Sequence, residues 1–354
     1  MEKLSIIIPV YYNEENLHPL YDDLKEKVLA KLPCDYEIVF VNDGSKDGSY
    51  DKLKELADMD PKVKLVNLAR NFGEHLATLA GLSECSGTVA VRKAADLQEP
   101  SEMILQMYEK YAAGSKVVLA VREDREEPIS QKLFSEVYCW MMRKFALSNM
   151  PKGGFDTFMI SRQVIDIIVE IGEKNAPLTE QILWSGFESE KIYYVRKKRE
   201  IGKSGWTLSK KIKLAIDSLL SFSYFPIRCI SVMGVVSILV SLIWTLVLVV
   251  DYLDGHTTVE GYTTIVVLIL LSFGITMLTL GILGEYIWRM FDEVRNRPAF
   301  IVDEVRQNKT DPCGAEQCET EQRGAKQCEA EQHGVEQCSA RKYEPEQYGG
   351  SAER

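Results

Sequence analysis

The sequence lacks several features that mark common functional classes. Its 354 residues include eight cysteines but no Cys-x-x-Cys pair, so a zinc site of the usual spacing has no support. The net charge of -10 provides no basic footprint and argues against nucleic acid as a partner. A signal peptide pattern is also missing, because the chain opens on a strand-like run, LSIIIPV. The body cysteines, Cys34, Cys85, Cys139 and Cys229, are therefore expected to be reduced.

The first 122 residues alternate between two kinds of segment. Short runs rich in Val and Ile predict strands at Leu4–Val10, Tyr36–Val41, Val63–Leu68, Thr88–Val91 and Lys116–Val121. Between them lie amphipathic stretches of helical length, such as 14–29 and 49–57. This alternation predicts β-α-β units and a buried parallel sheet. Such sheets bind ligands beyond the carboxyl ends of their strands, where Asp43, Asp96 and Arg122 lie.

A basic stretch follows the predicted sheet. Between Lys191 and Lys213 the chain carries nine Lys or Arg residues and one acid, Glu200. Apolar residues recur at helical spacing from Leu208 to Leu219, which predicts an amphipathic helix beginning near Trp206. Such a helix suits the surface of an anionic membrane, although a soluble surface helix has the same pattern.

Two long apolar runs come next, at about 230–253 and 262–288. Each exceeds the roughly 20 residues that cross a hydrocarbon core, so they predict a hairpin of two transmembrane helices. The loop between them, DYLDGHTTVEGY, has three acids and no Lys or Arg, whereas Arg228, Arg289 and Arg295 flank the runs. The positive-inside rule then places both termini in the cytoplasm.

The last fifty residues have a different composition. Gly314, Gly324 and Gly334 recur at intervals of ten, as does a Gln-Cys pair, and large aliphatic residues are nearly missing. This composition cannot bury a core and predicts a disordered, low-complexity tail. A thiol-based metal or oligomerisation tail is the alternative.

Two segments carry candidate chemistry. In VNDGS, Asp43 ends a buried strand, where a carboxylate can bind a base or ribose; an ordinary Asp-Gly turn is the alternative. In KAADLQEP, Asp96 follows the fourth predicted strand and could hold a divalent cation against a diphosphate, or could instead cap the helix that opens near Pro100.

These segments, taken in order with others, carry a resemblance. The set comprises IIIPVYYNEENL, VNDGS, ADLQEP, Arg122, GGFDTFMISR, KKREIGKSGW, FSYFPIR and GILGEYIWRMFDEVRNRP. It resembles glycosyltransferase family 2, and within it the bacterial polyisoprenyl-phosphate glycosyltransferases, relatives of dolichol-phosphate mannose synthase. The match runs from about Leu4 to about Val302. It implies an α/β glycosyltransferase-A fold, a Rossmann-like mixed sheet with flanking helices, joined to the transmembrane hairpin.

The resemblance also implies an organisation of the chain and roles for residues. The segments would be a cytoplasmic catalytic domain (1–204), an amphipathic juxtamembrane region (205–226), two transmembrane helices (227–290), a cytoplasmic juxtamembrane segment (291–304) and the tail (305–354). By analogy, the donor-binding residues are Pro9, Tyr11, Glu14, Asp43, Asp96 and Gln98; the phosphate-binding residues are Arg122, Arg199 and Lys203; the catalytic residues are Asp96 and Asp156; and the metal ligand is Asp96.

Two positions depart from the family pattern. The first acid of its usual D-x-D is replaced, since Ala94 and Ala95 precede Asp96. Metal binding would then depend on Asp96, the diphosphate and water. Gly205 follows Ser204 where the family often has Lys or Arg, and Lys203 could compensate.

The implied activity is that of an inverting, metal-dependent hexosyltransferase using Mg²⁺ or Mn²⁺. It would move a sugar from a nucleotide donor, with uridine favoured, onto undecaprenyl phosphate or a similar lipid at the bacterial inner membrane, for cell envelope biogenesis. Because a lipid phosphate is already anionic, no strong general base is needed. Relatives of this kind also suggest a homo-oligomer. Two alternatives stay open: transfer to another glycolipid or polysaccharide, and a non-catalytic membrane scaffold, which the replaced acid at Ala94 would favour.

Overall fold

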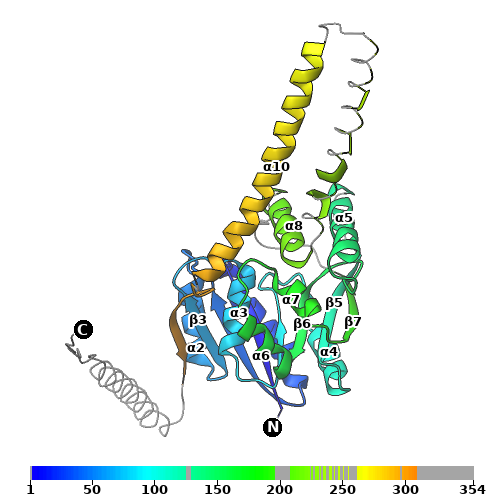
Figure 1. Ribbon diagram of the computed structural model, residues 1–354. Coiled ribbons are helices and arrows are strands. Elements are labelled where there is room, and N and C mark those ends of the chain that lie inside the picture. The colour runs from blue at the N-terminus through cyan, green and yellow to red at the C-terminus, as the bar shows by residue number, and fades with distance from the viewer. Residues whose placement is uncertain are drawn as a thin grey trace, which may run out of the picture. The chain divides into compact units, whose positions relative to one another are not determined.

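The computed structural model describes residues 2–124, 129–195, 208–223, 261–295 and 297–308, with scattered positions between 225 and 254. Its centre is an eight-stranded sheet with strand order β7-β5-β6-β4-β1-β2-β3-β8 (Figure 1). The strands are β1 (Lys3–Val10), β2 (Asp35–Asn42), β3 (Val63–Leu68), β4 (Val89–Arg92), β5 (Val117–Asp124), β6 (Phe155–Ser161), β7 (Ser189–Val195) and β8 (Val302–Gln307).

The sheet is mixed. Parallel pairs join β1 to β2 and β4, β2 to β3, and β5 to β7. Strand β6 is antiparallel to both β4 and β5, and β8 is antiparallel to β3. The five strands predicted from sequence are confirmed to within a few residues, and all five run in the same direction. The mixed sheet that the resemblance implies is also confirmed, because the antiparallel strand β6 lies between β4 and β5.

Helices cover both faces of the sheet. They are α1 (Leu17–Lys27), α2 (Ser49–Met59), α3 (Glu74–Glu84), α4 (Met103–Ala112), α5 (Ile129–Phe145), α6 (Arg162–Ile171), α7 (Leu178–Trp184), α8 (Leu208–Phe222) and α10 (Tyr262–Val294), with short 3-10 turns at Glu14–Asn16 and Leu29–Lys31. Helices α1, α2 and α4 pack on one face, and α3, α5, α6 and α7 pack on the other. Strand β1 shows why: Ile6 and Ile8 point into the first layer and Ile7 into the second, and all three are fully buried. The period of two along a strand thus supplies both cores.

The chain returns to the sheet after α10. Strand β8 pairs with β3, and Arg306 makes two 2.9 Å hydrogen bonds to the carboxylate of Asp58. The predicted start of the tail at Val305 is too early, because strand β8 continues to Gln307. The sheet thus includes a strand from beyond the segment 1–204 that the sequence predicts as the catalytic domain. The rest of the tail lies outside the described residues.

The predicted hairpin is described only in part. Most of its first run, 230–253, lies outside the described residues, while the second run forms α10. In the described part of the chain, no helix combines the length and apolar character that crossing a membrane requires. The amphipathic helix expected near Trp206 is found as α8, although Trp206 itself lies outside the described residues. The cysteines of the body are free, as expected.

The buried carboxylate of Glu37 connects the beginnings of strands β1 and β2 to the loop before β4. Glu37 of β2 accepts hydrogen bonds from the Ser5 hydroxyl (2.6 Å), the Lys3 ammonium (2.9 Å) and the Ser86 amide (2.6 Å). Burial alone would raise the pKa of this carboxyl, but the hydrogen bonds from Ser5, Ser86 and Lys3 outweigh it and lower the pKa to about 2. The ionised form is therefore the one that stabilises the fold.

Replacing Glu37 by Gln tests this carboxylate. Because the pKa is lower in the folded state, its stabilisation is present above about pH 4.5 and is lost as the pH falls toward about 2. The full effect is on the order of 3 kcal/mol. We expect Glu37→Gln to lower the melting temperature at pH 7 and to reduce its acid dependence. Thermal unfolding by circular dichroism at several pH values measures both. Exposed Glu26→Gln is the matched control, and equal acid dependence in wild type and Glu37→Gln would contradict this role.

Candidate active site

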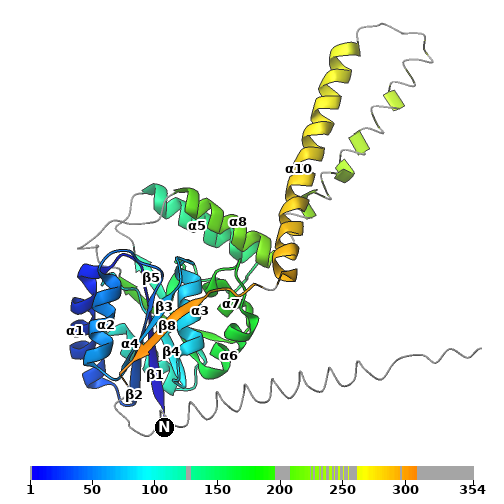
Figure 2. The same cartoon turned by 90° about the vertical axis from the view of Figure 1, so that its left-hand side faces the viewer.

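The predicted site residues come from strands whose ends meet at one edge of the sheet. Parallel pairing places Val10 beside Asn42 and Ile7 beside Arg92, so β1 and β2 end together and β4 ends three residues short of them at the same edge. The antiparallel strand β6 begins at this edge, where Val121 of β5 pairs with Phe155. Residues from separate parts of the sequence, Tyr11, Asp43, Asp96, Arg122 and Asp156, therefore lie along one rim. Helices α5 and α8 lie across this end of the domain (Figure 2).

Asp43 is fixed by backbone amides. Its side chain is buried, and its two oxygens accept hydrogen bonds from the amides of Phe72 (2.7 Å) and Gly73 (2.9 Å). Burial raises the pKa of the Asp43 carboxyl, although these two amides oppose the shift. Tyr11 lies near it: partial burial, Tyr12 and the charge of Asp43 together raise the pKa of the Tyr11 phenol. The carboxylate thus holds the start of α3 beside Tyr11.

The loops after β1 and β2 hold each other in place. Glu14 accepts a 2.9 Å hydrogen bond from the amide of Gly48, and the amide of Tyr12 donates to Ser45 Oγ at 3.2 Å. Tyr12 has a left-handed φ of 53°, an unfavourable conformation for a non-glycine residue. Gly44 has φ +66° and lies so close to the next loop that a Cβ would stand 2.6 Å from the carbonyl carbon of Arg70. Glu14 therefore holds a loop here, and its contact with a nucleotide stays a prediction.

Asp96 lies on the loop after β4. It is partly exposed, and its Oδ1 accepts a 3.3 Å hydrogen bond from the amide of Gln98. Between them Leu97 has a left-handed φ of 56°. Non-glycine residues with positive φ occur where the surrounding structure overrides the local cost, often at functional sites. Both described examples in this chain, Tyr12 and Leu97, flank this rim.

A buried ionic cluster lies beneath Asp96. Arg92, at the end of β4, forms ion pairs with Glu74 of α3 and with Glu99, and its guanidinium donates to Thr157 Oγ1 of β6 at 3.3 Å. We call these four residues the Arg92 cluster. Burial alone would raise the pKa of Glu99, but the charges of Arg92 and Lys93 hold it below its usual value. The cluster therefore carries an ionised carboxylate in the interior.

Glu99 also closes the loop that presents Asp96. Its carboxylate accepts a 3.2 Å hydrogen bond from the amide of Ala94, and its carbonyl accepts a 2.9 Å bond from the ammonium of Lys93. Lys93 is fully buried, and burial lowers its pKa. No motif in the sequence indicated a role for four of these residues: Glu74, Arg92, Lys93 and Glu99. The signal was present, since charged residues at the end of a buried strand are rarely buried unless they are paired.

Arg122 and Asp156 form an ion pair at the other end of the rim. The Arg122 side chain is 9% exposed and that of Asp156 is 49% exposed, so the acid faces outward while the arginine is held. Arg122 Nε also donates to the Tyr194 hydroxyl at 3.4 Å. Gly153 permits this approach, because a Cβ there would lie 2.4 Å from the carbonyl oxygen of Arg122. Two residues predicted separately from sequence are thus direct neighbours.

Of the four remaining predicted site residues, two are described by the structure and two are not. Pro9 is half-buried in β1 opposite Val41, and Gln98 is half-buried on the Asp96 loop. Arg199 and Lys203 lie outside the described residues. In the described ranges, no three His, Cys, Asp or Glu side chains are grouped to hold a metal ion. Asp96 nevertheless offers the oxygen ligand that Mg²⁺ prefers, on a loop fixed from below.

The comparisons with known proteins identify the family. Residues 5–166 match the model of glycosyl transferase family 2. An uncharacterized glycosyltransferase, YkcC of Bacillus subtilis, is 35% identical over 85% of this chain and 93% of its own. The chain belongs to glycosyl transferase family 2. The bactoprenol glucosyl transferase of Shigella phage SfII is 34% identical over 85% of this chain and 97% of its own length. The resemblance inferred from the motifs is therefore confirmed.

Solved structures give weaker similarity. Glucosyl-3-phosphoglycerate synthase of Mycobacterium tuberculosis, crystallised with Mn²⁺, UDP and phosphoglyceric acid, has a TM-score of 0.46 at 11% identity and covers 62% of this chain and 78% of its own. The mannosyltransferase PcManGT of Pyrobaculum calidifontis, in complex with GDP-Man and Mn²⁺, has a TM-score of 0.41 at 18% identity and covers 57% and 58%.

The Arg92 cluster gives a prediction about stability. Removing one partner of a buried ion pair leaves a buried charge unpaired, which costs about 3–5 kcal/mol. We expect Arg92→Met to lower the free energy of unfolding by about this amount, and Arg92→Lys by less, because Lys keeps the charge. Denaturant unfolding followed by circular dichroism measures the loss. Arg306→Met, which breaks an exposed pair with Asp58, should change stability little. If the two Met variants are equally stable, the cluster is not what holds this part of the sheet.

Proposed function

We propose that this glycosyltransferase moves a sugar from a nucleotide donor, a UDP-sugar, onto the phosphate of a polyisoprenyl phosphate. The observation that carries the proposal is the arrangement of Asp43, Asp96 and the Arg122–Asp156 pair along one rim of the sheet. Its similarity to a bactoprenol glucosyl transferase over 85% of the chain supports the choice of acceptor.

The residues of the rim fit the parts of this reaction. Asp43 and Tyr11 lie where a base or ribose would bind at the ends of β1 and β2. Asp96 would approach the diphosphate, and a Mg²⁺ or Mn²⁺ ion held there would stabilise the charge that develops on it. Arg122 has the planar fork that binds phosphate with two hydrogen bonds. The carboxylate of Asp156 forms an ion pair with this guanidinium. Its side chain faces outward, where it would orient the sugar or the acceptor.

The proposed chemistry is a single inverting displacement. An oxygen of the lipid phosphate forms a bond to the anomeric carbon as the bond from that carbon to the diphosphate oxygen breaks. The nucleoside diphosphate leaves with the electron pair, and attack from the opposite side inverts the anomeric centre. The lipid phosphate is anionic near neutral pH, so Asp156 is not required to remove a proton.

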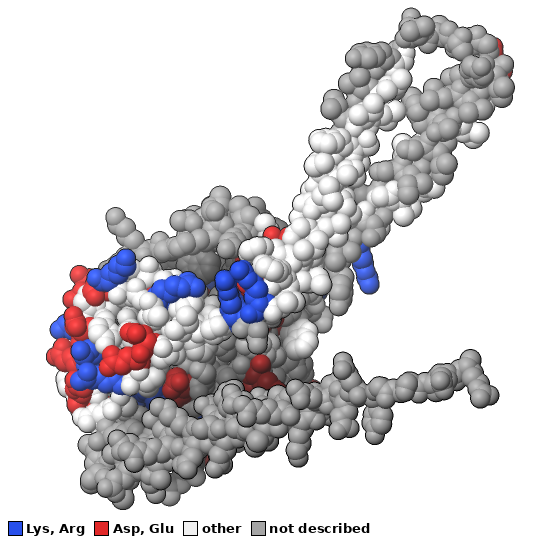
Figure 3. Space-filling model, turned by 60° about the vertical axis from the view of Figure 1, so that its left-hand side comes forward, with Lys and Arg blue, Asp and Glu red and all other residues white. Residues whose placement is uncertain are grey.

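We further propose that the chain is anchored at the cytoplasmic face of the bacterial inner membrane. Apolar side chains of α10 are exposed along its length, among them Ile269 (59%), Phe273 (58%) and Ile287 (64%). Figure 3 shows α10 as a column without Lys, Arg, Asp or Glu over most of the face in view, with basic side chains gathered near its junction with the domain. A solvent-exposed surface of this kind is typical of a membrane contact.

Helices α5 and α8 extend the proposed membrane contact. They are joined by Tyr138, whose hydroxyl donates to buried Glu180 at 2.6 Å and lies 3.0 Å from the hydroxyl of Ser218. Trp140 of α5 and Ile216 of α8 are each 51% exposed. Exposed apolar side chains beside the active-site rim would hold the domain at the membrane, where a lipid phosphate is found, and so raise the effective concentration of the acceptor.

Transfer assays on two substitutions test the proposed active site. The assay combines purified full-length protein, undecaprenyl phosphate, a panel of UDP- and GDP-sugars, and Mg²⁺ or Mn²⁺. We expect Asp96→Ala and Asp156→Ala each to lower the rate by roughly a hundredfold or more, because each removes a group that acts on charge in the transition state. Asp166→Ala, an exposed acid on α6, is the control. Chelation of the metal should also stop transfer.

The same assay separates the alternatives. Label that appears only on a glycan or another lipid would show a different acceptor, and tight nucleotide binding without turnover of any donor would show a scaffold. Near-normal rates in Asp96→Ala or Asp156→Ala would remove that residue from the active site.

A further inference from the structure

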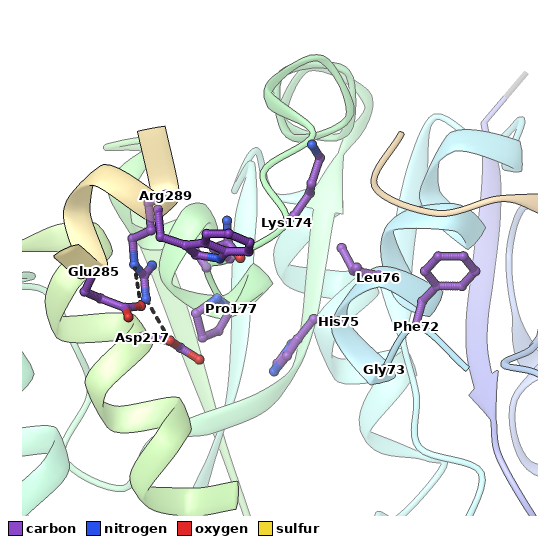
Figure 4. A pocket seen from close by; sticks show the side chains of 12 residues that line it. Phe72, Gly73, His75, Leu76, Lys174, Pro177, Asp217, Glu285 and Arg289 are labelled. Carbon is purple, nitrogen blue, oxygen red and sulfur yellow. Dashed lines mark hydrogen bonds and ion pairs between the residues drawn. The ribbon is translucent and has the colours of Figure 1, made fainter. Parts of the chain in front are cut away.

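A cavity of about 290 Å³ lies between the catalytic domain and the helices α8 and α10 (Figure 4). The domain contributes His75 and Leu76 from the first turn of α3, and Pro177 from the loop before α7. The helices contribute Asp217, Trp288 and Arg289. The volume is close to the lower limit for ligand sites, about 300 Å³.

The cavity shares a wall with the proposed donor site. Phe72 and Gly73 line it, and their amides hold Asp43 from the other side. A ligand in the cavity would therefore lie one segment of backbone away from Asp43. The opposite wall is formed by helices that we propose to lie at the membrane, so the cavity connects the two regions that the reaction has to bring together.

Polar groups in the cavity are suited to an anion. Nε2 of His75 is buried and has no hydrogen-bond partner among the described residues, and Figure 4 shows the ring extending from α3 toward the side of Asp217. A buried polar atom without a partner destabilises the empty cavity, and a ligand that accepts or donates a hydrogen bond there would remove this cost. Lys174 also lines the cavity and brings a positive charge to it (Figure 4).

Arg289 is held at the cavity by both helices. Its guanidinium lies 2.7 Å from Asp217 Oδ1 and 3.0 Å from Ser221 Oγ of α8, and 3.5 Å from Glu285 Oε1 of α10. The two acids balance its charge before a ligand binds. A phosphate would share the guanidinium with Asp217, while Lys174 supplies a second positive charge and His75 presents its unpartnered Nε2.

The other side of the cavity is apolar. Leu76, Pro177 and Trp288 line it, and the exposed side chains of Ile287 and Phe291 continue along α10. A nucleotide base could also stack on Trp288, but the apolar surface continues beyond the cavity along α10, which suits a long hydrocarbon chain better. The chemistry that fits both halves is a phosphate monoester on an apolar chain.

We propose that this cavity receives the acceptor before transfer, with Lys174 and Arg289 contacting its phosphate and Trp288 contacting the first carbons of its isoprenyl chain. The proposal depends on the proposed function for the identity of the acceptor. The residues of the active-site rim then carry out the displacement, so Lys174, Trp288 and Arg289 contribute to binding of the acceptor and not to that of the donor.

Steady-state kinetics of Lys174→Ala and Trp288→Ala test this proposal. We expect each to raise the KM for undecaprenyl phosphate about tenfold, corresponding to the loss of one good contact, while the KM for the donor changes less than twofold. Lys25→Ala on α1 and Trp184→Ala on α7 are matched controls, because both residues are exposed and lie away from the cavity. An unchanged KM for the lipid in both cavity variants would overturn the proposal.

A binding experiment makes the outcome independent of turnover. Farnesyl phosphate should quench tryptophan fluorescence in wild type and much less in Trp288→Phe, and inorganic phosphate should compete only weakly. Equal competition by inorganic phosphate would show an anion site without lipid recognition, which contradicts the proposed ligand. If wild type binds farnesyl phosphate in this way but transfers no sugar to any lipid phosphate, the proposed function fails while the cavity assignment stands. Equal quenching in Trp288→Phe rejects the assignment.

Discussion

The guanidinium of Arg92 is the contact on which the geometry of the active-site rim depends. It lies at the end of a central strand, where it binds Glu74, Glu99 and Thr157 at once. These partners belong to helix α3, to the Asp96 loop and to strand β6. A charge buried this completely is tolerated only with paired and hydrogen-bonded partners. The cluster therefore specifies one arrangement of three elements that are far apart in the sequence.

The contacts continue from this cluster in both directions. Glu74 begins α3, directly after the Phe72 and Gly73 amides that bind Asp43. Thr157 follows Asp156, whose carboxylate pairs with Arg122 and through it reaches Tyr194 of β7. A chain of buried or half-buried polar contacts thus runs from β2 to β7. Such preorganisation places charged groups before substrates bind, which is the arrangement that electrostatic stabilisation of a leaving group requires.

The region between the domain and α10 has a different character. Its helices expose large apolar side chains, and two polar contacts help to hold them: Tyr138 of α5 donates a hydrogen bond to Glu180 of α7, and Arg289 of α10 pairs with Asp217 of α8. Burial raises the pKa of the Glu180 carboxyl, which matches its position below α5 and α8. The cavity at this boundary exists because α3, α8 and α10 meet without filling the space between them.

The sequence by itself determined the α/β class, the first five strands, the family, and the residue types at the rim. Periodicity and motif order carry that information because each depends on neighbours along the chain. Only the tertiary structure decided that β6 inserts antiparallel between β4 and β5, that β8 returns to pair with β3, and that Arg122 meets Asp156. It also decided that Arg92, Lys93 and Glu99 are buried together beneath Asp96. Pairing across the sheet and the burial of charge depend on partners distant in sequence, and no local pattern records which distant residue will supply them.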